Sequence, residues 1–216
     1  MARPRTHHDE KKQELIRISF QLFMQNGYEN TRIQDIMNAA KISKGAMYHY
    51  FASKDEILDA VLNYIIDLDI ARVQPVLTDP SLRVLEKLTA SMSFEMPQAT
   101  QEIRQASEYI QQRPASIFDY RARELSRSRS ISALSQLIRE GIKTGEFHTD
   151  YPDEMAAFIY AAAQSMGEML MCRTEDANPS RTIEAFLRTL TYCLGLEKKG
   201  QEYLAEFFKN NINTER

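Results

Sequence analysis

The sequence predicts an all-α protein. Its 216 residues include only seven Pro and seven Gly, and no run of Val, Ile and Thr alternates strictly with polar residues as strands do. Apolar residues recur instead at the three- and four-residue spacing of one helix face. Because 43% of the residues are hydrophobic, the chain can bury a sizeable core, and its length suits one large domain or two small ones.

The first predicted helix spans about residues 10–26. One face of this segment collects apolar and small residues at helical spacing: Ile16, Ser19, Phe20 and Phe23. Gly27 follows where a helix end favours a left-handed residue, and Tyr28 can supply the apolar contact just beyond it. The segment is therefore expected to pack as an amphipathic helix that stops at Gly27.

Two short helices are expected next. Thr31 and Gln34 have the spacing of a capping box, which predicts the start of a second helix that ends near "AAKIS". Ser43 can cap a third helix that runs to about Phe51. Two short helices joined by a tight turn predict a helix-turn-helix.

A long fourth helix is expected over about residues 54–73, because Ser53 and Glu56 form another capping box before it. Prolines then divide the remainder into five apolar-periodic segments, which brings the expected total to about nine helices. These segments span about 81–95, 98–112, 115–143, 153–173 and 180–209.

The third helix has two faces of different chemistry. At 100° per residue, Met47, Tyr50 and Phe51 share one arc and are expected to be core. The opposite arc holds Lys44, Gly45, Tyr48 and His49, with Ala46 on the flank. A helix this short is not stable alone, so neighbours must anchor it while its outer face meets something else.

The outer face suits DNA. Lys44 can donate to phosphates or to guanine acceptors, and the small Gly45 and Ala46 let the helix approach base edges. Tyr48 and His49 can hydrogen-bond phosphates, although both could be ordinary surface residues. The full set of candidate DNA-binding residues is Thr31, Arg32, Gln34, Ser43, Lys44, Gly45, Ala46, Tyr48, His49 and Lys54.

The stretch "GYENTRIQDIMNAAKISKGAMYHYFASKDEIL" (27–58) resembles the amino-terminal DNA-binding domain of the TetR family of bacterial transcriptional regulators. Shared features include the turn at Gly27, the "MYHYF" core of the third helix and Lys54 followed by acidic and apolar residues. Beyond residue 60 the resemblance covers helix count, length and the pattern "GEFHTDYPDEMAAFI". The resemblance implies a homodimer built mainly on the last two helices, and a palindromic double-stranded DNA operator released when a small effector binds.

With this resemblance, the expected domains are a flexible basic arm at 1–9, a helix-turn-helix DNA-binding domain at 10–54 and a helical effector-binding and dimerisation domain at 55–216. The basic residues of the arm and of the segment just after it are Arg3, Arg5, Lys11 and Lys12. They either enter a minor groove or belong to a solubilising tail.

Candidate effector and dimer residues follow from apolar composition. An apolar pocket between the later helices would draw on Phe94, Met96, Tyr109, Phe118, Met166 and Met169, which could equally be plain core. The expected dimer interface comprises Ala157, Ala161, Met166, Phe186, Leu190 and Leu194.

Other classes of protein fit less well. No metal-ligand spacing, nucleophile elbow or phosphate-binding glycine loop occurs, so neither an enzyme nor a cofactor or metal is expected. An enzyme on a helical scaffold and a chaperone-like module remain the alternatives.

No secretory signal or membrane span is found, and Cys172 and Cys193 are too few for a disulfide scaffold, which predicts a cytoplasmic protein. Neither cysteine is marked as an activated redox sensor.

Overall fold

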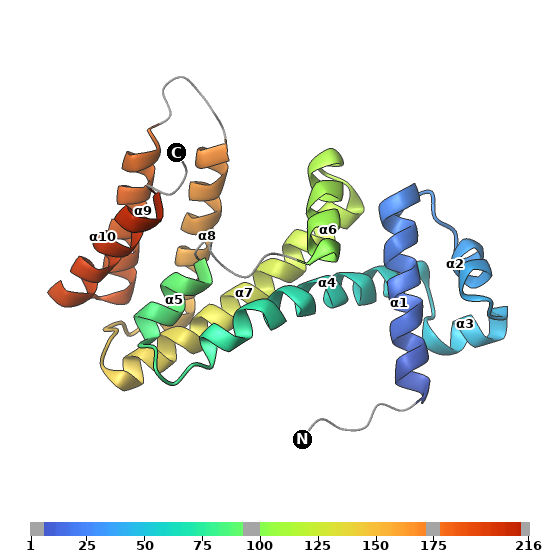
Figure 1. Ribbon diagram of the computed structural model, residues 1–216, viewed down its shortest axis with the longest axis horizontal. Helices are drawn as coiled ribbons and strands as arrows, with labels where there is room; N and C mark the ends of the chain where they lie inside the picture. The colour runs from blue at the N-terminus through green and yellow to red at the C-terminus, as the bar shows by residue number, and fades with distance from the viewer. Residues whose placement is uncertain (1–6, 93–99, 172–177, 213–216) are drawn as a thin grey trace. The chain divides into compact units, whose positions relative to one another are not determined.

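The computed structural model describes residues 7–92, 100–171 and 178–212, and these form ten helices and no strand (Figure 1). The predicted all-α class is confirmed. The helices are α1 (His7–Asn26), α2 (Ile33–Ala40), α3 (Lys44–Tyr50), α4 (Lys54–Leu77), α5 (Val84–Met92), α6 (Gln101–Gln112), α7 (Ile117–Thr144), α8 (Pro152–Met171), α9 (Pro179–Leu194) and α10 (Lys198–Ile212).

The chain divides into two compact units. Met1–Arg72 and Ala99–Ser126 contribute to the first unit, and Val73–Gln98 and Arg127–Arg216 to the second. Residues 10–54, predicted as the helix-turn-helix domain, lie inside the first unit. That unit also takes in most of α4, all of α6 and the beginning of α7.

The first unit packs its helices around one apolar core. Side chains from five different helices are fully buried in it: Leu15, Phe23, Ile36, Met47, Ile57, Leu58, Val61 and Phe118. The apolar face predicted for α1 is confirmed, because Ile16, Phe20 and Phe23 are all buried. The core therefore joins α1 to α3, α4 and the start of α7 through side chains that are distant in sequence.

Three predicted helix ends in this unit are confirmed. Gly27 has a left-handed φ of 86° after α1, and the Tyr28 ring packs edge-on against Phe23. The Ser43 hydroxyl accepts the Ala46 N–H at 3.2 Å and caps α3. Ser53 accepts the Glu56 N–H at 3.1 Å before α4.

The capping box predicted at Thr31 and Gln34 is wrong. The Thr31 hydroxyl donates back to the Gly27 carbonyl at 2.8 Å, which satisfies it inside the turn. Helix α2 begins one residue later, and the carboxylate of Asp35 accepts the N–H of Arg32 at 2.7 Å. Gln34 instead donates to Asn38 along the helix.

The second unit has its own core. Buried side chains from α5, α7, α8, α9 and α10 form it, among them Val84, Leu88, Ile138, Ala156, Ile159, Phe186, Leu190, Leu194 and Leu204. The Glu146 carboxylate ties the loop after α7 to the start of α5, where it accepts the N–H groups of Val84 at 2.9 Å and Leu85 at 3.2 Å. Among the described residues, no helix combines the length and apolar content needed to cross a membrane.

The segment predicted as one helix over 180–209 is two helices, α9 and α10. Gly195 has a φ of 58°, and the Leu196 N–H closes the turn on the carbonyl of Thr191. The Leu194 carbonyl accepts the N–H of His148 at 2.8 Å. A Cβ on Gly195 would lie 2.1 Å from the carbonyl oxygen of His148, so only glycine fits this close approach.

Replacing this glycine is expected to destabilise the second unit. In Gly195→Ala, the left-handed backbone costs roughly 1–2 kcal/mol, and the clash with His148 adds about 1–3 kcal/mol of overpacking. Gly145→Ala is the matched control, because Gly145 also has a left-handed φ, of 76°, but open space around its Cβ position. Denaturant unfolding of both variants gives the comparison, and equal losses of stability would contradict the proposed close approach.

Candidate nucleic-acid interface

Helices α2 and α3 present the candidate interface. Ile36, Met37 and Ala40 of α2 face the core, and the helix ends at Lys41, which has a left-handed φ of 54°. Lys41 N–H and Ile42 N–H close the last turn on the carbonyls of Asn38 and Met37. Lys41 is exposed between the two helices, a cation near α3 that the sequence reasoning passed over.

The faces of α3 lie as the sequence predicts. Met47 is fully buried, and Lys44, Gly45, Tyr48 and His49 are exposed. Ser43 is exposed at the cap, Ala46 is half-buried on the flank, and Tyr50 is half-buried rather than fully core. The Lys44 amine lies 5.9 Å from the centroid of the Tyr48 ring.

Neither the backbone conformation nor the packing at Gly45 requires a glycine. Its φ is not left-handed, and a Cβ added there would meet no atom within 4 Å beyond its own helix backbone. The missing side chain therefore leaves the amino end of α3 open from outside. A backbone that is free to approach a partner closely is what reading of base edges in a major groove requires.

The start of α2 contributes fewer residues than predicted. Arg32 and Gln34 are exposed and can reach a partner. Thr31 is 0% exposed, so its predicted role as a DNA clamp is wrong: its hydroxyl serves the turn at Gly27 instead. Threonine is a common cap, and nothing in its sequence spacing signals that it turns inward.

Lys54 is partly drawn into the protein. Its amine donates to the Glu29 carbonyl at 3.1 Å and lies 4.4 Å from the centroid of the Tyr28 ring. Burial lowers the pKa of Lys54 below its ordinary value, although the charges of Glu29 and Asp55 oppose that shift. A phosphate contact by Lys54 stays a prediction, and it would require the amine to turn outward.

The turn between α1 and α2 is held by α6 and α4. Tyr109 of α6 accepts the buried N–H of Tyr28 at 3.0 Å, and the Tyr28 hydroxyl donates to Asp55 at 2.6 Å. Burial and the Asp55 carboxylate raise the pKa of Tyr28, so the phenol keeps its proton. Arg121 of α7 pairs with Asp59 at 2.9 Å on the same side of α4.

Tyr109 and Phe118 therefore pack in the core of the first unit, and neither lines the described pocket, so their assignment to an effector site stays a prediction. Tyr109 is 3% exposed and Phe118 is 0% exposed, with their rings 5.0 Å apart. The phenol of Tyr109 is already used by the Tyr28 N–H. Apolar spacing on a helix does not separate a core from a pocket wall.

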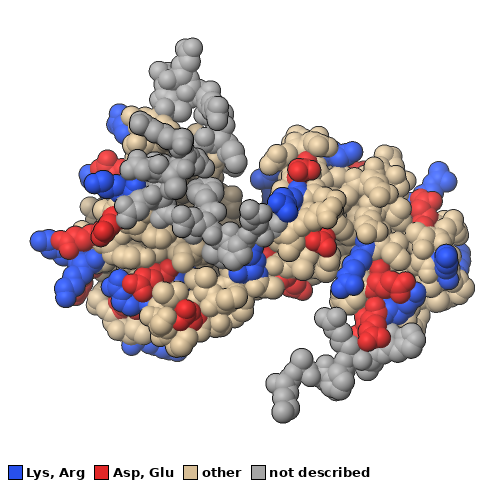
Figure 2. All heavy atoms as spheres, viewed as in Figure 1, with Lys and Arg blue, Asp and Glu red and all other residues tan. Residues whose placement is uncertain are grey.

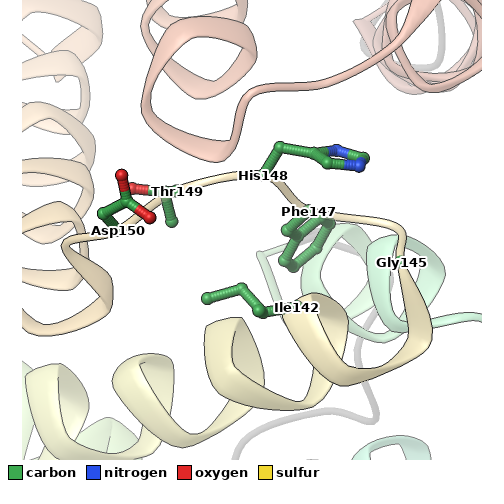
Figure 3. Close-up of a pocket in the computed structure, with 6 residues that line it drawn as sticks. All are labelled: Ile142, Gly145, Phe147, His148, Thr149 and Asp150. Carbon is green, nitrogen blue, oxygen red and sulfur yellow. The ribbon is translucent and has the colours of Figure 1, made fainter.

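The structure describes only two of the remaining effector candidates. Phe94 and Met96 lie outside the described residues. Met166 is half-buried against the second core, and Met169 is 55% exposed. A pocket of about 410 Å³ lies at the end of α7 and in the loop before α8 (Figure 3), and none of the predicted residues lines it. Its lining consists of Ile142, Gly145, Phe147, His148, Thr149 and Asp150.

The predicted dimer residues fall on different faces. Phe186, Leu190 and Leu194 are buried within the chain, against α8 and neighbouring helices, so their assignment to an interface is wrong. Ala157 is half-buried, like Met166, whereas Ala161 is exposed. The outward faces of α8 and α9 carry large apolar side chains instead: Phe158 at 59%, Met169 at 55% and Tyr192 at 84% exposure.

Charge and cysteine chemistry do not define this interface. On the side drawn in Figure 2, lysines and arginines stand among acidic residues in both units. Cys193 is a half-buried free thiol whose pKa is raised by burial, and Cys172 lies outside the described residues. No group of three metal-ligating side chains occurs in the part of the chain that the structure describes.

Comparisons with known proteins match this arrangement. The family model "Bacterial regulatory proteins, tetR family" matches residues 15–61, which span most of α1, all of α2 and α3, and the start of α4. The uncharacterized HTH-type transcriptional regulator YuxN of Bacillus subtilis is 44% identical over 64 residues, or 30% of this chain and 22% of that protein. The HTH-type transcriptional repressor KstR2 of Mycolicibacterium smegmatis is 34% identical over 87 residues, or 39% of this chain and 42% of KstR2. The chain thus spans less than half the length of these two relatives.

Solved structures extend the likeness to the whole fold. A TetR-family transcriptional regulator from Rhodococcus sp. has a TM-score of 0.58 and 20% identity, covering 86% of this chain and 98% of that one. Another, from Syntrophomonas wolfei, has a TM-score of 0.55 and 23% identity, covering 89% and 99%. The family model covers the helices that present α3, so residues 15–61 form an amino-terminal domain of the TetR-family type. The remaining helices share the fold of these solved structures.

Proposed function

We propose that this protein is a transcriptional repressor that binds a palindromic DNA operator as a homodimer and leaves it when a small hydrophobic effector binds. The exposed face of α3 carries the proposal. Its buried side is anchored by Met47, and its outer side offers Lys44, Gly45, Tyr48 and His49. These are groups that suit base edges and phosphates.

The proposed docking places the amino end of α3 in the major groove. Lys44 and the flank at Ala46 lie at that end, where they can contact base edges. Tyr48 and His49 lie one turn later, where phosphates border the groove. Arg32 and Gln34 at the exposed start of α2 are suited to the backbone on the other side.

The homodimer is proposed to form on the outward faces of α8 and α9. Phe158, Ala161 and Met169 share one side of α8 by their spacing, and all three are exposed. Tyr192, at 84%, is the most exposed large apolar side chain among the residues that the structure describes. A two-fold dimer would set its two α3 helices about 34–36 Å apart, one turn of DNA.

Release by an effector is proposed to work by population shift. A ligand that binds more tightly to a conformation with misplaced α3 helices lowers operator affinity by that difference. The first unit offers a physical connection for such a change. Tyr109 of α6 supports the N–H of Tyr28, in the turn that leads to α2, so a displaced α6 withdraws that support.

DNA binding is tested first with duplexes selected from random sequence by the full chain. Lys44→Ala is expected to cost about 1–3 kcal/mol at particular base pairs and to relax sequence preference there. Tyr48→Ala is expected to weaken binding to all selected sequences by a similar factor. Binding isotherms on a panel of single-base variants measure both effects.

Tyr120→Ala is the matched control, because Tyr120 is also an exposed tyrosine, at 66%, but lies on α7. It is expected to leave both affinity and preference unchanged. Identical profiles for Lys44→Ala and Tyr48→Ala would contradict the separate roles, and failure of the wild-type chain to select any sequence would contradict the repressor assignment.

The dimer face is tested by adding charge to it. Phe158→Glu is expected to yield monomers by sedimentation at concentrations where the wild type is dimeric, because the change buries a charge in an apolar contact. Its unfolding midpoint should stay near that of the wild type, since Phe158 is 59% exposed in the single chain.

Leu190→Ala provides the contrast on the inner face of α9. Leu190 is 0% exposed, so truncation is expected to cost about 2–5 kcal/mol of stability. An unchanged oligomeric state in Phe158→Glu would place the dimer interface elsewhere.

A further inference from the structure

Besides His49 on α3 itself, a second histidine, His8, lies beside α3. The His8 ring, at the amino-terminal end of α1, is 5.3 Å from the His49 ring of α3 in an edge-on arrangement, and 4.8 Å from the Tyr50 ring. His49 and Tyr50 are themselves 5.5 Å apart. Figure 1 shows this end of α1 beside α3. Three rings from two helices therefore meet at the edge of the candidate DNA-binding face.

The cluster is open to solvent. The His8 side chain is 48% exposed, and His49 is exposed on the same arc of α3 as Tyr48. Aromatic packing alone does not account for two histidines in this position, because a buried or half-buried apolar ring would pack against Tyr50 as well. Imidazoles at a surface add a group that can become charged near neutral pH.

The charged neighbours of the cluster come from both helices. On α1, the carboxylate of Asp9 lies 3.8 Å from His8 Nδ1, and the amine of Lys12 lies 5.3 Å from the centroid of the Phe51 ring. On α3, the amine of Lys44 lies over Tyr48. The Asp9 carboxylate thus lies against the cluster itself, while the two lysines lie over the neighbouring rings of Phe51 and Tyr48.

We propose that His8 and His49 together hold one backbone phosphate of the operator, both as imidazolium. The proposal rests on the DNA-binding function proposed above. Two positively charged rings this close repel each other. A phosphate between them reverses that effect, because it accepts hydrogen bonds from both N–H groups and neutralises both charges. Operator binding is therefore coupled to proton uptake.

The direction of the pH effect follows from this coupling. Phosphate favours the charged imidazoles, so their contribution to affinity is present at low pH and is lost as the pH rises through the range where the bound rings release their protons.

The salt dependence of binding measures the contact directly. With the selected duplex and the full chain, the slope of log affinity against log salt is expected to be steeper at pH 6 than at pH 8. Each phosphate neutralised adds roughly 0.9 to the slope, so a homodimer with two such sites gains about two. His8→Gln and His49→Gln should each remove most of this difference, and the double variant should remove no more than either alone.

Two further variants distinguish the contact from loss of folding. His148→Gln changes an exposed histidine of the second unit and should keep the wild-type pH dependence. His8→Lys supplies a permanent cation, so its slope should be steep at both pH values. Thermal unfolding should be the same for wild type, His8→Gln and His8→Lys.

The outcomes separate this inference from the proposed function. If His8→Gln keeps the full pH dependence of the slope, or if His8→Lys binds no better than His8→Gln at pH 8, the shared phosphate site is excluded. If the wild-type chain binds the duplex with one slope at both pH values, the site is likewise excluded although the repressor function stands. If no duplex is bound at either pH, the repressor function itself fails.

Discussion

A helix of seven residues cannot hold itself in water, and the candidate interface depends on how this one is anchored. Nucleation costs more than so few hydrogen bonds return, so α3 exists only because neighbours bury one of its sides. Met47 and Phe51 supply that anchor in a core shared with α1 and α4, and each is worth about 1.5–3 kcal/mol of burial. The outer side of α3 does not contribute to this core, so it can carry Lys44, Gly45 and His49 together.

The support of this anchor reaches well beyond the three helices that surround it. Tyr109 comes from α6 and Arg121 from α7, yet they hold the Gly27 turn and the start of α4 through Tyr28 and Asp59. The position of α2 and α3 is thus set partly by residues that follow them by more than fifty positions in the sequence. Contacts of this kind connect α6 and α7 to the helices that carry the candidate interface.

Local signals in the sequence predict much of the first unit. The all-α class, the ends at Gly27, Ser43 and Ser53, and the two faces of α3 all follow from capping chemistry and helical periodicity. Thr31 shows where such reasoning stops, because a hydroxyl that can cap the next helix can also bond backward to Gly27. His8 was missed as well, since its neighbours His49 and Tyr50 are distant in sequence and only the packing of α1 on α3 brings them together.

The second unit is less predictable because apolar periodicity identifies a face without naming what covers it. The spacing of Leu190 and Phe186 fits a core position and an interface position equally well. In the structure both belong to the core of the second unit. The break at Gly195 was also hidden, since its glycine is required by the carbonyl of His148, far away in the sequence.

The contact between His148 and Leu194 has a consequence for how the chain can vary in length. It closes a loop that contains α8 and α9, and it ties the carboxyl-terminal end of α9 to the loop before α8 (Figure 1). The entropy of closing a loop grows only with the logarithm of its length. Insertions between α8 and α9 therefore change the free energy of this pairing slowly, so the connection can accept new sequence while the helix pair keeps its register.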